Sequence, residues 1–315
     1  MAEERSRTGH RGRRQRRSMQ ASFPSDPASL DDALDAAELS DDTLAGSLRV
    51  YQRRRGHRYS LDDVVTAWVA ARSRPAAERA LDLGCGLGSV LLMLAYKLPE
   101  ARIWGIEAQA QSFALCGRNV ERNGVGARVN LTHGDLRQQN LGARLGAGSF
   151  DLISATPPYK KPHEGTLPPD SQKAHARFEL RGGVEDYLKA AAPLLAPSGR
   201  LVICAEASQP ERVLATAPGL GLCALKELRV LPAAHYKRPL FTVWTLGPCD
   251  GGAPSPGCVR EADFVARDHQ GRRTAAARQL RLFFGLDAAE GEPDSPRLRA
   301  RRPGSKGGEG DGVVR

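Results

Sequence analysis

The feature of this sequence that most constrains its fold is a regular alternation of short apolar runs with longer segments of helical periodicity. Runs of about five apolar residues suit strands that are buried on both faces. Strands that alternate with helices form a parallel sheet with helices packed on its faces, so we predict an α/β fold. We expect strands over Ala80–Leu83, Arg102–Ile106, Arg128–Thr132, Phe150–Ala155, Arg200–Ala205, Leu225–Leu231 and Leu240–Leu246. We expect helices over Ser89–Leu98, Gln109–Asn123, Val184–Leu195, Pro210–Ala217 and Thr274–Phe284.

Both ends of the chain differ in composition from this middle part. Residues 1–40 are rich in arginine and then in Ser, Asp, Pro and Ala, and residues 287–315 mix Gly, Pro, Asp and Arg with almost no large apolar side chains. Segments of this kind bury too little apolar surface to fold. We therefore predict a disordered basic N-terminal tail over 1–40, one folded domain over 41–286 and a disordered C-terminal tail over 287–315.

Positive charge is concentrated near the N-terminus. The first twenty residues hold seven arginines and two glutamates, so 7 − 2 = 5 of the net charge of +10 belong to this segment. Clustered cations attract phosphate groups, which makes nucleic acid the first partner to consider, although a solvated leader explains such a segment equally well. We expect these arginines, together with Arg53, Arg54, Arg55 and Arg58, to add RNA affinity that does not depend on base sequence.

Composition disfavours several classes of protein. No apolar run approaches the roughly 20 residues that a membrane span requires. The six cysteines are scattered without a C-x-x-C pair, which argues against a zinc site and against a disulfide framework. The basic N-terminus lacks the apolar region of a secretory signal. We expect a cytoplasmic protein in a reducing compartment, without a bound metal and without membrane contact, and a monomer is compatible with the sequence.

The strongest local motif is a glycine loop after the first predicted strand, with the sequence Asp82-Leu83-Gly84-Cys85-Gly86-Leu87-Gly88. Glycines between a strand and a helix let a ligand approach the backbone, although a tight strand-to-helix turn would also use them. The spacing G-x-G-x-G differs from the G-x-G-x-x-G of dinucleotide-binding proteins, which disfavours NAD-dependent redox chemistry, and it is typical of methyltransferases. We expect the cofactor to bind at Asp82, Gly84, Gly86 and Gly88.

Acidic residues follow the next two predicted strands. Glu107 lies about twenty residues beyond the glycine loop, where a carboxylate can accept hydrogen bonds from both ribose hydroxyls of a nucleoside. Asp135 follows the third strand at the rim of the same crevice, within reach of the adenine amino group of a cofactor. Each residue also has a purely structural explanation, because Glu107 would favour the start of a helix and Asp135 would cap a turn.

The fourth predicted strand runs into Thr156-Pro157-Pro158-Tyr159 at the same edge of the sheet, and we expect these four residues to form the catalytic site. The lone pair of an exocyclic amino nitrogen is delocalised into its ring, so a catalyst has to hold both N–H groups with rigid acceptors. The side chain of Thr156 and the carbonyl of Pro157 would accept these two hydrogen bonds, and Tyr159 would stack on the target base. The alternative is a Pro-Pro turn beside an ordinary buried tyrosine.

These motifs together resemble those of the class I S-adenosylmethionine-dependent methyltransferases that act on amino groups and carry an N/D/S-P-P-Y/F motif. The chain is most similar to the bacterial tRNA(Val) adenine-N6 methyltransferases. That likeness spans about residues 44–286 and includes the segments Gly56–Trp68, Ala174–Phe178 and Phe264–Asp268.

This resemblance implies a doubly wound, Rossmann-like sheet of seven mostly parallel strands with the last strand antiparallel. It also implies S-adenosylmethionine as the cofactor, tRNA as the partner and an anticodon-loop adenine as the substrate. The segment Gly56–Trp68 would help to close the cofactor site, and we expect Asp62 to be its cofactor-binding residue.

One position departs from the family pattern, because Thr156 stands where the family has asparagine. Threonine accepts a hydrogen bond with its hydroxyl but reaches less far. Three functions stay open. The first is N6 methylation of an adenine in RNA, most simply tRNA. The second is methylation of a protein glutamine amide or of another nucleic-acid amino group, because N-P-P-Y also serves protein glutamine methyltransferases. The third is a cofactor-binding, RNA-binding protein without turnover. The basic character of the chain favours RNA over protein.

Overall fold

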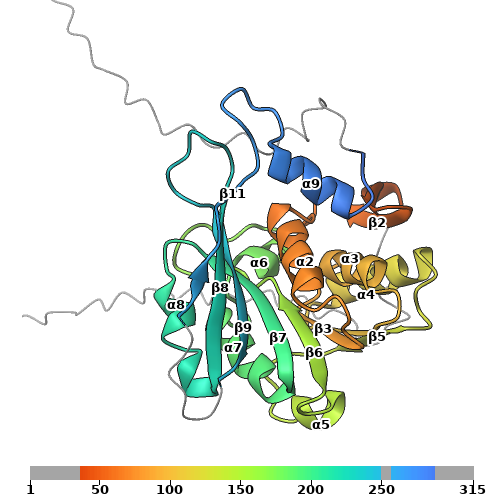
Figure 1. The fold of residues 1–315 in the computed structure, drawn as a ribbon. Coiled ribbons are helices and arrows are strands. Elements are labelled where there is room, and N and C mark those ends of the chain that lie inside the picture. The colour runs from red at the N-terminus through yellow and green to blue at the C-terminus, as the bar shows by residue number, and fades with distance from the viewer. Residues whose placement is uncertain (1–35, 250–256, 288–315) are drawn as a thin grey trace, which may run out of the picture.

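The computed structural model describes residues 36–249 and 257–287 of the chain. Its centre is one large sheet (Figure 1), in which the main strands lie side by side in the order β5 (Val129–His133), β4 (Arg102–Glu107), β3 (Arg79–Leu83), β6 (Phe150–Ala155), β7 (Leu195–Glu206), β9 (Phe241–Pro248) and β8 (Leu222–Leu231). Six of these strands are parallel, and β9 runs antiparallel between β7 and β8. The expected α/β sheet with an antiparallel last main strand is confirmed. Two short strands, β10 (Val259–Arg260) and β11 (Phe264–Val265), pair in parallel with β8.

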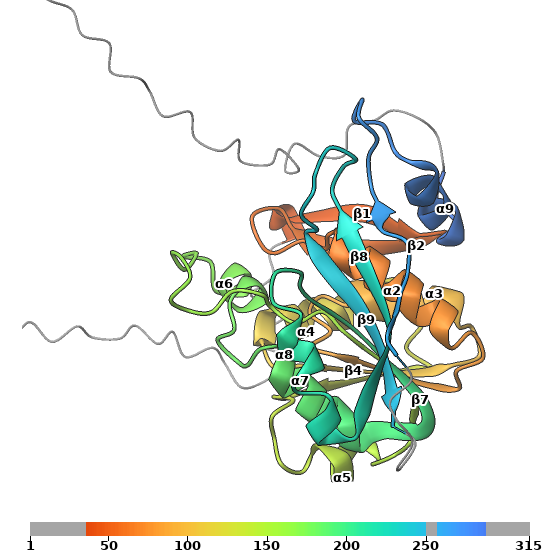
Figure 2. The same cartoon turned by 60° about the vertical axis from the view of Figure 1, so that its left-hand side comes forward.

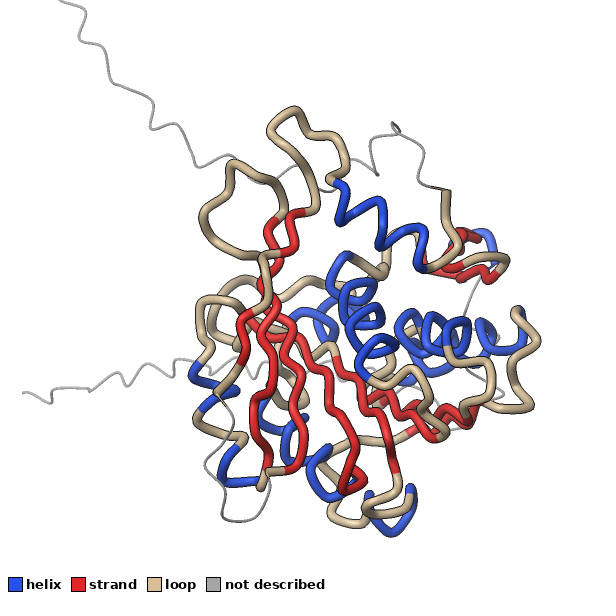
Figure 3. Tube along the Cα trace, in the orientation of Figure 1, coloured by secondary structure: helices blue, strands red, loops and turns tan. Residues whose placement is uncertain are grey.

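Helices cover both faces of this sheet, which makes the fold doubly wound (Figure 3). One face carries α2 (Leu61–Ser73), α3 (Ser89–Lys97) and α4 (Ala110–Arg122), and α9 (Ala275–Phe283) packs beside α2. The other face carries α5 (Leu141–Leu145), α7 (Val184–Ala191), α8 (Glu211–Leu214) and the short turns η2 (Ala192–Leu194) and η3 (Pro218–Leu220). Neighbouring strand residues point to opposite faces, so Ala80 packs in the first layer and Leu81 in the second.

Three local features differ from the expectations. No helix is expected before Ser89, whereas Leu61–Ser73 forms a helix of 13 residues. The helix expected over Pro210–Ala217 shortens to α8, because Pro218 begins a separate turn. The helix expected over Val184–Leu195 ends at Ala191, where a proline-containing turn leads into β7.

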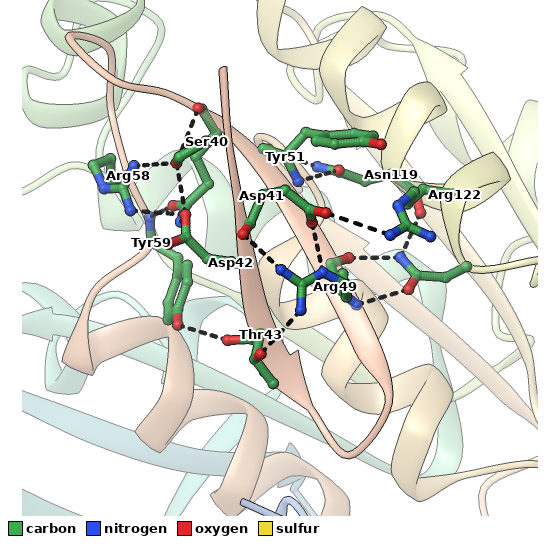
Figure 4. Close-up of polar contacts among 12 residues, drawn as sticks. Ser40, Asp41, Asp42, Thr43, Arg49, Tyr51, Arg58, Tyr59, Asn119 and Arg122 are labelled. Atoms are coloured by element: carbon green, nitrogen blue, oxygen red, sulfur yellow. Dashed lines mark hydrogen bonds and ion pairs between the residues drawn. The ribbon is translucent and has the colours of Figure 1, made fainter. Parts of the chain in front are cut away.

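A hairpin of β1 (Leu39–Ala45) and β2 (Leu48–Arg53), preceded by the turn η1 (Ala36–Glu38), is also absent from the expectations. It begins before the expected domain boundary at residue 41, and residues 1–35 and 288–315 of the two expected tails lie outside the described residues. Side-chain amides of α4 hold the hairpin (Figure 4). Asn119 Oδ1 accepts a hydrogen bond from the backbone nitrogen of Tyr51 at 2.7 Å. Asn123, which caps the end of α4, accepts one with its Oδ1 from the backbone nitrogen of Arg49 at 2.8 Å.

The hairpin region also changes the expected role of two arginines. Arg58 forms an ion pair with Asp42 at 2.9 Å (Figure 4), and Arg53 forms one with Asp170 at 2.8 Å. Both guanidinium groups are mostly buried, with 27% and 15% of their side chains exposed. The expectation that Arg53 and Arg58 serve mainly as RNA-attracting surface charges is therefore wrong, because their charge is used inside the fold.

The cysteines provide a further correction. Cys223 on β8 and Cys249 just after β9 form a disulfide, although they are 26 residues apart in sequence. The antiparallel pairing of Cys223 with Gly247 brings the two side chains together, and no C-x-x-C spacing announces such a contact. The sequence argued against a disulfide framework and did not anticipate this single disulfide, so the inference of a reducing compartment loses that support. In residues 36–249 and 257–287, no helix is both long and apolar enough to cross a membrane.

Candidate active site

A pocket lies at the carboxyl edge of the parallel strands, where the loops after β3, β4, β5 and β6 meet. Ligands of open α/β sheets bind at this edge. The loop after β3 contributes Gly84 and Gly86, β4 contributes Glu107, and Asp135 and Thr156 follow β5 and β6. The strand order therefore brings together six of the residues predicted from the sequence, these five and Pro158.

The three glycines of the loop have positive φ angles of 67°, 57° and 92° at Gly84, Gly86 and Gly88. A Cβ atom at Gly84 would lie 2.4 Å from the hydroxyl of Tyr187, and one at Gly88 would lie 2.8 Å from Cys116 Sγ. Around Gly86 the corresponding space is open. Gly84 and Gly88 thus permit close packing, whereas Gly86 exposes its backbone to the pocket. Gly88 caps α3 and does not line the pocket.

Glu107 is held by two backbone amides. Its carboxylate accepts hydrogen bonds from the nitrogen of Gly86 at 2.9 Å and from that of Gln109 at 2.6 Å. Burial raises the pKa of Glu107 above its usual value. A carboxylate offers about four acceptor positions, so lone pairs remain for the ribose hydroxyls of a bound nucleoside.

Asp135 combines the two roles that the sequence left open. It lines the pocket, and its Oδ1 also accepts from the backbone nitrogen of Arg137 at 3.0 Å, as in a turn cap. Its two oxygens contact the guanidinium of Arg137 at 2.9 and 2.7 Å, and these hydrogen bonds hold the pKa of Asp135 below its usual value. Arg181, which the sequence analysis did not single out, is an exposed cation at the same rim and also lowers this pKa.

Asp82 does not line the pocket, in contrast to the expected cofactor contact. It lies 2% exposed beneath the glycine loop, where its Oδ1 accepts from the hydroxyl of Ser154 at 2.8 Å. Burial raises the pKa of Asp82 to about 7. Asp82 and Ser154 are also partners in the register of β3 and β6, so their hydrogen bond links these two strands just below the glycine loop.

Thr156 faces Asp63, a residue that the sequence analysis missed. The hydroxyl of Thr156 donates to Asp63 Oδ1 at 3.4 Å, while Asp63 Oδ2 accepts from the backbone nitrogen of Ser60 at 2.9 Å. Burial, with the nearby charge of Asp62, raises the pKa of Asp63 well above its usual value. Asp63 is the third residue of α2 after the cap Ser60, so a capping-box pattern was the signal that could have identified it.

Asp62 and Tyr159 lie outside this pocket and contact each other instead. The hydroxyl of Tyr159 lies 3.2 Å from Asp62 Oδ2 and 2.9 Å from Cys204 Sγ. Burial raises the pKa of Tyr159 well above its usual value. Pro158 lines the main pocket, whereas Pro157 and Tyr159 line a smaller cavity behind it. The hydroxyl of Tyr159 is thus anchored in the interior, while the residue as a whole is half-buried and borders the smaller cavity.

The outer wall of the pocket comes from α6 (Ser171–Arg177) and from the segment before α2, which contribute Gln172, His175 and His57. Gln172 is 2% exposed, and its Oε1 accepts from the backbone nitrogen of His57 at 3.1 Å. His175 Nδ1 lies 2.9 Å from the carbonyl oxygen of Ser171 and can only donate to it, which makes Nε2 an acceptor in the neutral ring. Burial lowers the pKa of His57, which keeps this ring neutral at pH 7.

The residues of the pocket suit S-adenosylmethionine. The exposed backbone of Gly86 allows close approach of a ligand, and the carboxylates of Glu107 and Asp135 line the same pocket as acceptors for ribose hydroxyls and an amino group. In the described parts of the chain, no group of three or more His, Cys, Asp or Glu side chains is placed to hold a metal ion.

Comparisons with known proteins agree with this geometry. Residues 60–218 match the family model "Methyltransferase small domain". The tRNA1(Val) (adenine(37)-N6)-methyltransferase of Porphyromonas gingivalis is 33% identical over 183 residues, which cover 56% of this chain and 70% of that protein. The release factor glutamine methyltransferase of Geobacter sulfurreducens is 35% identical over 169 residues, which cover 51% of this chain and 57% of that protein.

The solved structure of a protein described as a predicted O-methyltransferase from Agrobacterium tumefaciens has the same fold. It matches with a TM-score of 0.55 at 16% identity and covers 72% of this chain and 98% of that chain. The match to the family model covers half of the sequence, from the start of α2 to the end of α8 and beyond. The chain thus belongs to the methyltransferase small domain family and is an S-adenosylmethionine-dependent methyltransferase.

Proposed function

We propose that this enzyme methylates the exocyclic N6 of an adenine in RNA, with tRNA as the substrate class. The observation that carries the proposal is the position of Thr156, which lines the same pocket as the glycine loop and Glu107. When bound, S-adenosylmethionine supplies an electrophilic methyl group. The protein has to present the nitrogen lone pair to this methyl group and to hold the two N–H bonds away from it.

The contact between Thr156 and Asp63 supports an acceptor role for the threonine. Because the hydroxyl proton of Thr156 points to Asp63 Oδ1, its lone pairs are left to accept an N–H group. The carbonyl of Pro157 would take the second hydrogen, and Pro158 would form the wall against which the base rests. We assign Tyr159 a positioning role, since its bonds to Asp62 and Cys204 anchor the Pro-Pro turn from behind.

Two properties of the chain favour RNA. The relative from Porphyromonas gingivalis is named for methylation of a tRNA adenine, and the net charge of +10 suits a polyanionic substrate. A tRNA substrate also implies a cytoplasmic reaction. The second candidate is the side-chain amide of a protein glutamine, because the relative from Geobacter sulfurreducens is named for that acceptor. Adenine and glutamine both present a planar amino nitrogen to the same pair of acceptors.

The test is incubation of the full chain with tritiated S-adenosylmethionine and with either tRNA or a protein substrate, followed by nucleoside and amino-acid analysis. We expect label in N6-methyladenosine. Label in methylglutamine would replace the proposal by the second candidate, and a chain that binds the cofactor but labels neither substrate would overturn both.

The acceptor role of Thr156 has its own test. Thr156→Val removes the hydroxyl at almost constant shape, so turnover should fall tenfold or more, the equivalent of roughly 1–3 kcal/mol, while cofactor affinity stays unchanged. Thr156→Ser is the matched control and should retain activity. Thr156→Asn, which supplies a longer acceptor, should retain or raise it. Full turnover by Thr156→Val would remove the threonine from the mechanism.

A further inference from the structure

Two loops extend side by side from the carboxyl ends of β8 and β11, at the carboxyl edge of the sheet (Figures 1 and 2). One connects β8 to β9 over residues 232–240, and the other follows β11 over residues 266–273. They are joined by hydrogen bonds from the backbone nitrogen of Ala234 to the carbonyl of Arg267 at 2.8 Å and from that of Ala266 to the carbonyl of Leu231 at 2.9 Å. We call these residues the basic double loop.

The double loop lies on the same edge as the pocket for a topological reason. β8 is parallel to β6, so Leu231 at its end and Thr156 after β6 leave the sheet in the same direction. β9, which receives the first loop, is separated from β6 by β7 alone. With about 4.8 Å between neighbouring strands, the loop begins at β8 roughly 14 Å to the side of β6 and returns to β9 at roughly 10 Å, within the width of a nucleic-acid stem.

The chemistry of the double loop suits a single-stranded or looped nucleic acid. Its sequences, Pro-Ala-Ala-His-Tyr-Lys-Arg-Pro-Leu and Ala-Arg-Asp-His-Gln-Gly-Arg-Arg, hold five lysines and arginines against one aspartate. Lys237 and Arg238 are exposed and form no ion pair with any residue in the described parts of the chain. Beside them, the rings of His235 and Tyr236 pack with centroids 4.6 Å apart. Cations next to aromatic rings are what a backbone phosphate and an unstacked base require.

Three arginines of the hairpin region already have acidic partners. Arg49, Arg53 and Arg58 are each paired with an aspartate at 2.8–2.9 Å. In the double loop, the single aspartate, Asp268, pairs with Arg272, which is 61% exposed, and so exposed a pair is weak and readily exchanged for a phosphate. Lys237 and Arg238 therefore add exposed positive charge to an edge that already carries Arg181 at the rim of the pocket.

We propose that the basic double loop is the surface on which the substrate RNA docks next to its target base. Lys237 and Arg238 contact phosphates that flank the flipped adenine, and a neighbouring base stacks on Tyr236. The proposal rests on the RNA substrate proposed above, and it assigns the docking surface to a part of the chain that lies 76 residues or more beyond Thr156 in sequence, from Pro232 onward.

The test compares two double variants of the full chain that remove the same charge at opposite edges of the sheet. Lys237→Gln with Arg238→Gln neutralises the double loop. The matched control is Arg102→Gln with Lys189→Gln, because Arg102 begins β4 and Lys189 lies near the end of α7, both away from the pocket. Binding of tRNA is measured by electrophoretic mobility shift at several salt concentrations without cofactor, and cofactor binding is measured by calorimetry.

We expect the double-loop variant to raise the Kd for tRNA at least tenfold and to lower the slope of log Kd against log salt by about 1.5, since two phosphate contacts are lost. Its cofactor affinity and its turnover at saturating tRNA stay unchanged, and the control variant binds tRNA within threefold of wild type. Tyr236→Ala should weaken tRNA binding about tenfold, whereas Tyr236→Phe keeps it.

The proposal is overturned if both double variants lose the same affinity, which would reflect net charge alone, or if neither loses any. Failure of the underlying function has a different signature. In that case the wild-type chain leaves tRNA unlabelled and methylates a protein instead. If the wild-type chain methylates tRNA but the double-loop variant binds tRNA as tightly as wild type, only the docking surface is rejected.

Discussion

Replacing Asn119 with alanine should loosen the cofactor loop as well as the N-terminal hairpin. The fully buried amide of Asn119 accepts from the backbone nitrogen of Tyr51 at 2.7 Å. It donates to the carbonyl oxygens of Tyr51 at 3.1 Å and of Leu87 at 2.8 Å. Leu87 lies between two glycines of the loop that lines the pocket, so one side chain fixes β2 and the glycine loop to α4.

The size of the effect follows from these three bonds. An unsatisfied buried polar group costs about 1–3 kcal/mol. Tyr51 is half-buried, so water can replace part of its two bonds, whereas Leu87 is 3% exposed and keeps most of the penalty. We expect Asn119→Ala to lower the free energy of unfolding by about 3 kcal/mol. The glycine loop, without its bond to Asn119, then spends less time in the conformation that binds the cofactor. We expect a tenfold loss of cofactor affinity, which corresponds to about 1.4 kcal/mol.

Asn123→Ala is the matched control. Asn123 pairs with the backbone nitrogen and carbonyl of Arg49 at 2.8 and 2.7 Å, in the manner of Asn119, but it does not contact the glycine loop. Urea unfolding should show both variants destabilised, and calorimetry should show weaker binding of S-adenosylmethionine only for Asn119→Ala. Equal loss of cofactor affinity in both variants, or in neither, would refute the link between the hairpin and the loop.

Three further predictions concern buried charge and backbone strain. The pKa of Asp82 is raised from 3.8 to about 7, so the folded protein keeps a proton that the unfolded chain releases, and stability declines as the pH rises through this range. Asp82→Asn should flatten that decline in urea titrations, and an unchanged slope would contradict the assignment. Arg212→Leu should cost about 3–5 kcal/mol of unfolding free energy, because it strands the carboxylate of Glu179, which is 9% exposed, whereas the more exposed Arg229→Leu should cost less than about 1 kcal/mol. Gly86→Ala should cost about 1–2 kcal/mol of backbone strain at φ 57° but abolish cofactor binding measured by calorimetry, because its Cβ enters the pocket.

The strands of the main sheet could be predicted because each is an apolar run buried between two layers of helices. The range expected over Phe150–Ala155, for example, coincides with β6. Four of its six residues are hydrophobic and fully buried, as a strand between two layers of helices requires. The hairpin could not be predicted in the same way. β1 has the sequence Leu-Ser-Asp-Asp-Thr-Leu-Ala, which resembles the polar segment before it, and β2 is held by amides of α4 that lie 68 and 74 residues further along the chain.

In the site, the residues placed by the order of the strands could be predicted, whereas the directions of individual side chains could not. Glu107, Asp135 and Thr156 could be predicted, because the carboxyl ends of parallel strands meet at one edge whatever the side chains do. Asp82 could also have been placed correctly, since strand alternation turns it to the face of Ala80, away from that edge and beneath α3. Asp63 required a helix to be recognised first, and only then does the capping geometry turn it toward Thr156.

Tyr159 marks the limit of motif reasoning, because T-P-P-Y fixes the position of the residue but not the direction of its ring. The direction is decided by Asp62 and Cys204, which come from α2 and β7 and offer partners for the hydroxyl in the interior. Removing the hydroxyl of Tyr159 distinguishes a role in anchoring the Pro-Pro turn from a role in stacking on the target base. If Tyr159 only anchors the turn, Tyr159→Phe removes the hydroxyl partner of Asp62 Oδ2 and loosens the Pro-Pro turn, so turnover should fall severalfold with little change in the Kd for tRNA. If the ring instead moved to stack on the base during catalysis, Tyr159→Phe would keep full turnover and Tyr159→Ala would lose it, since stacking requires the ring and not its oxygen.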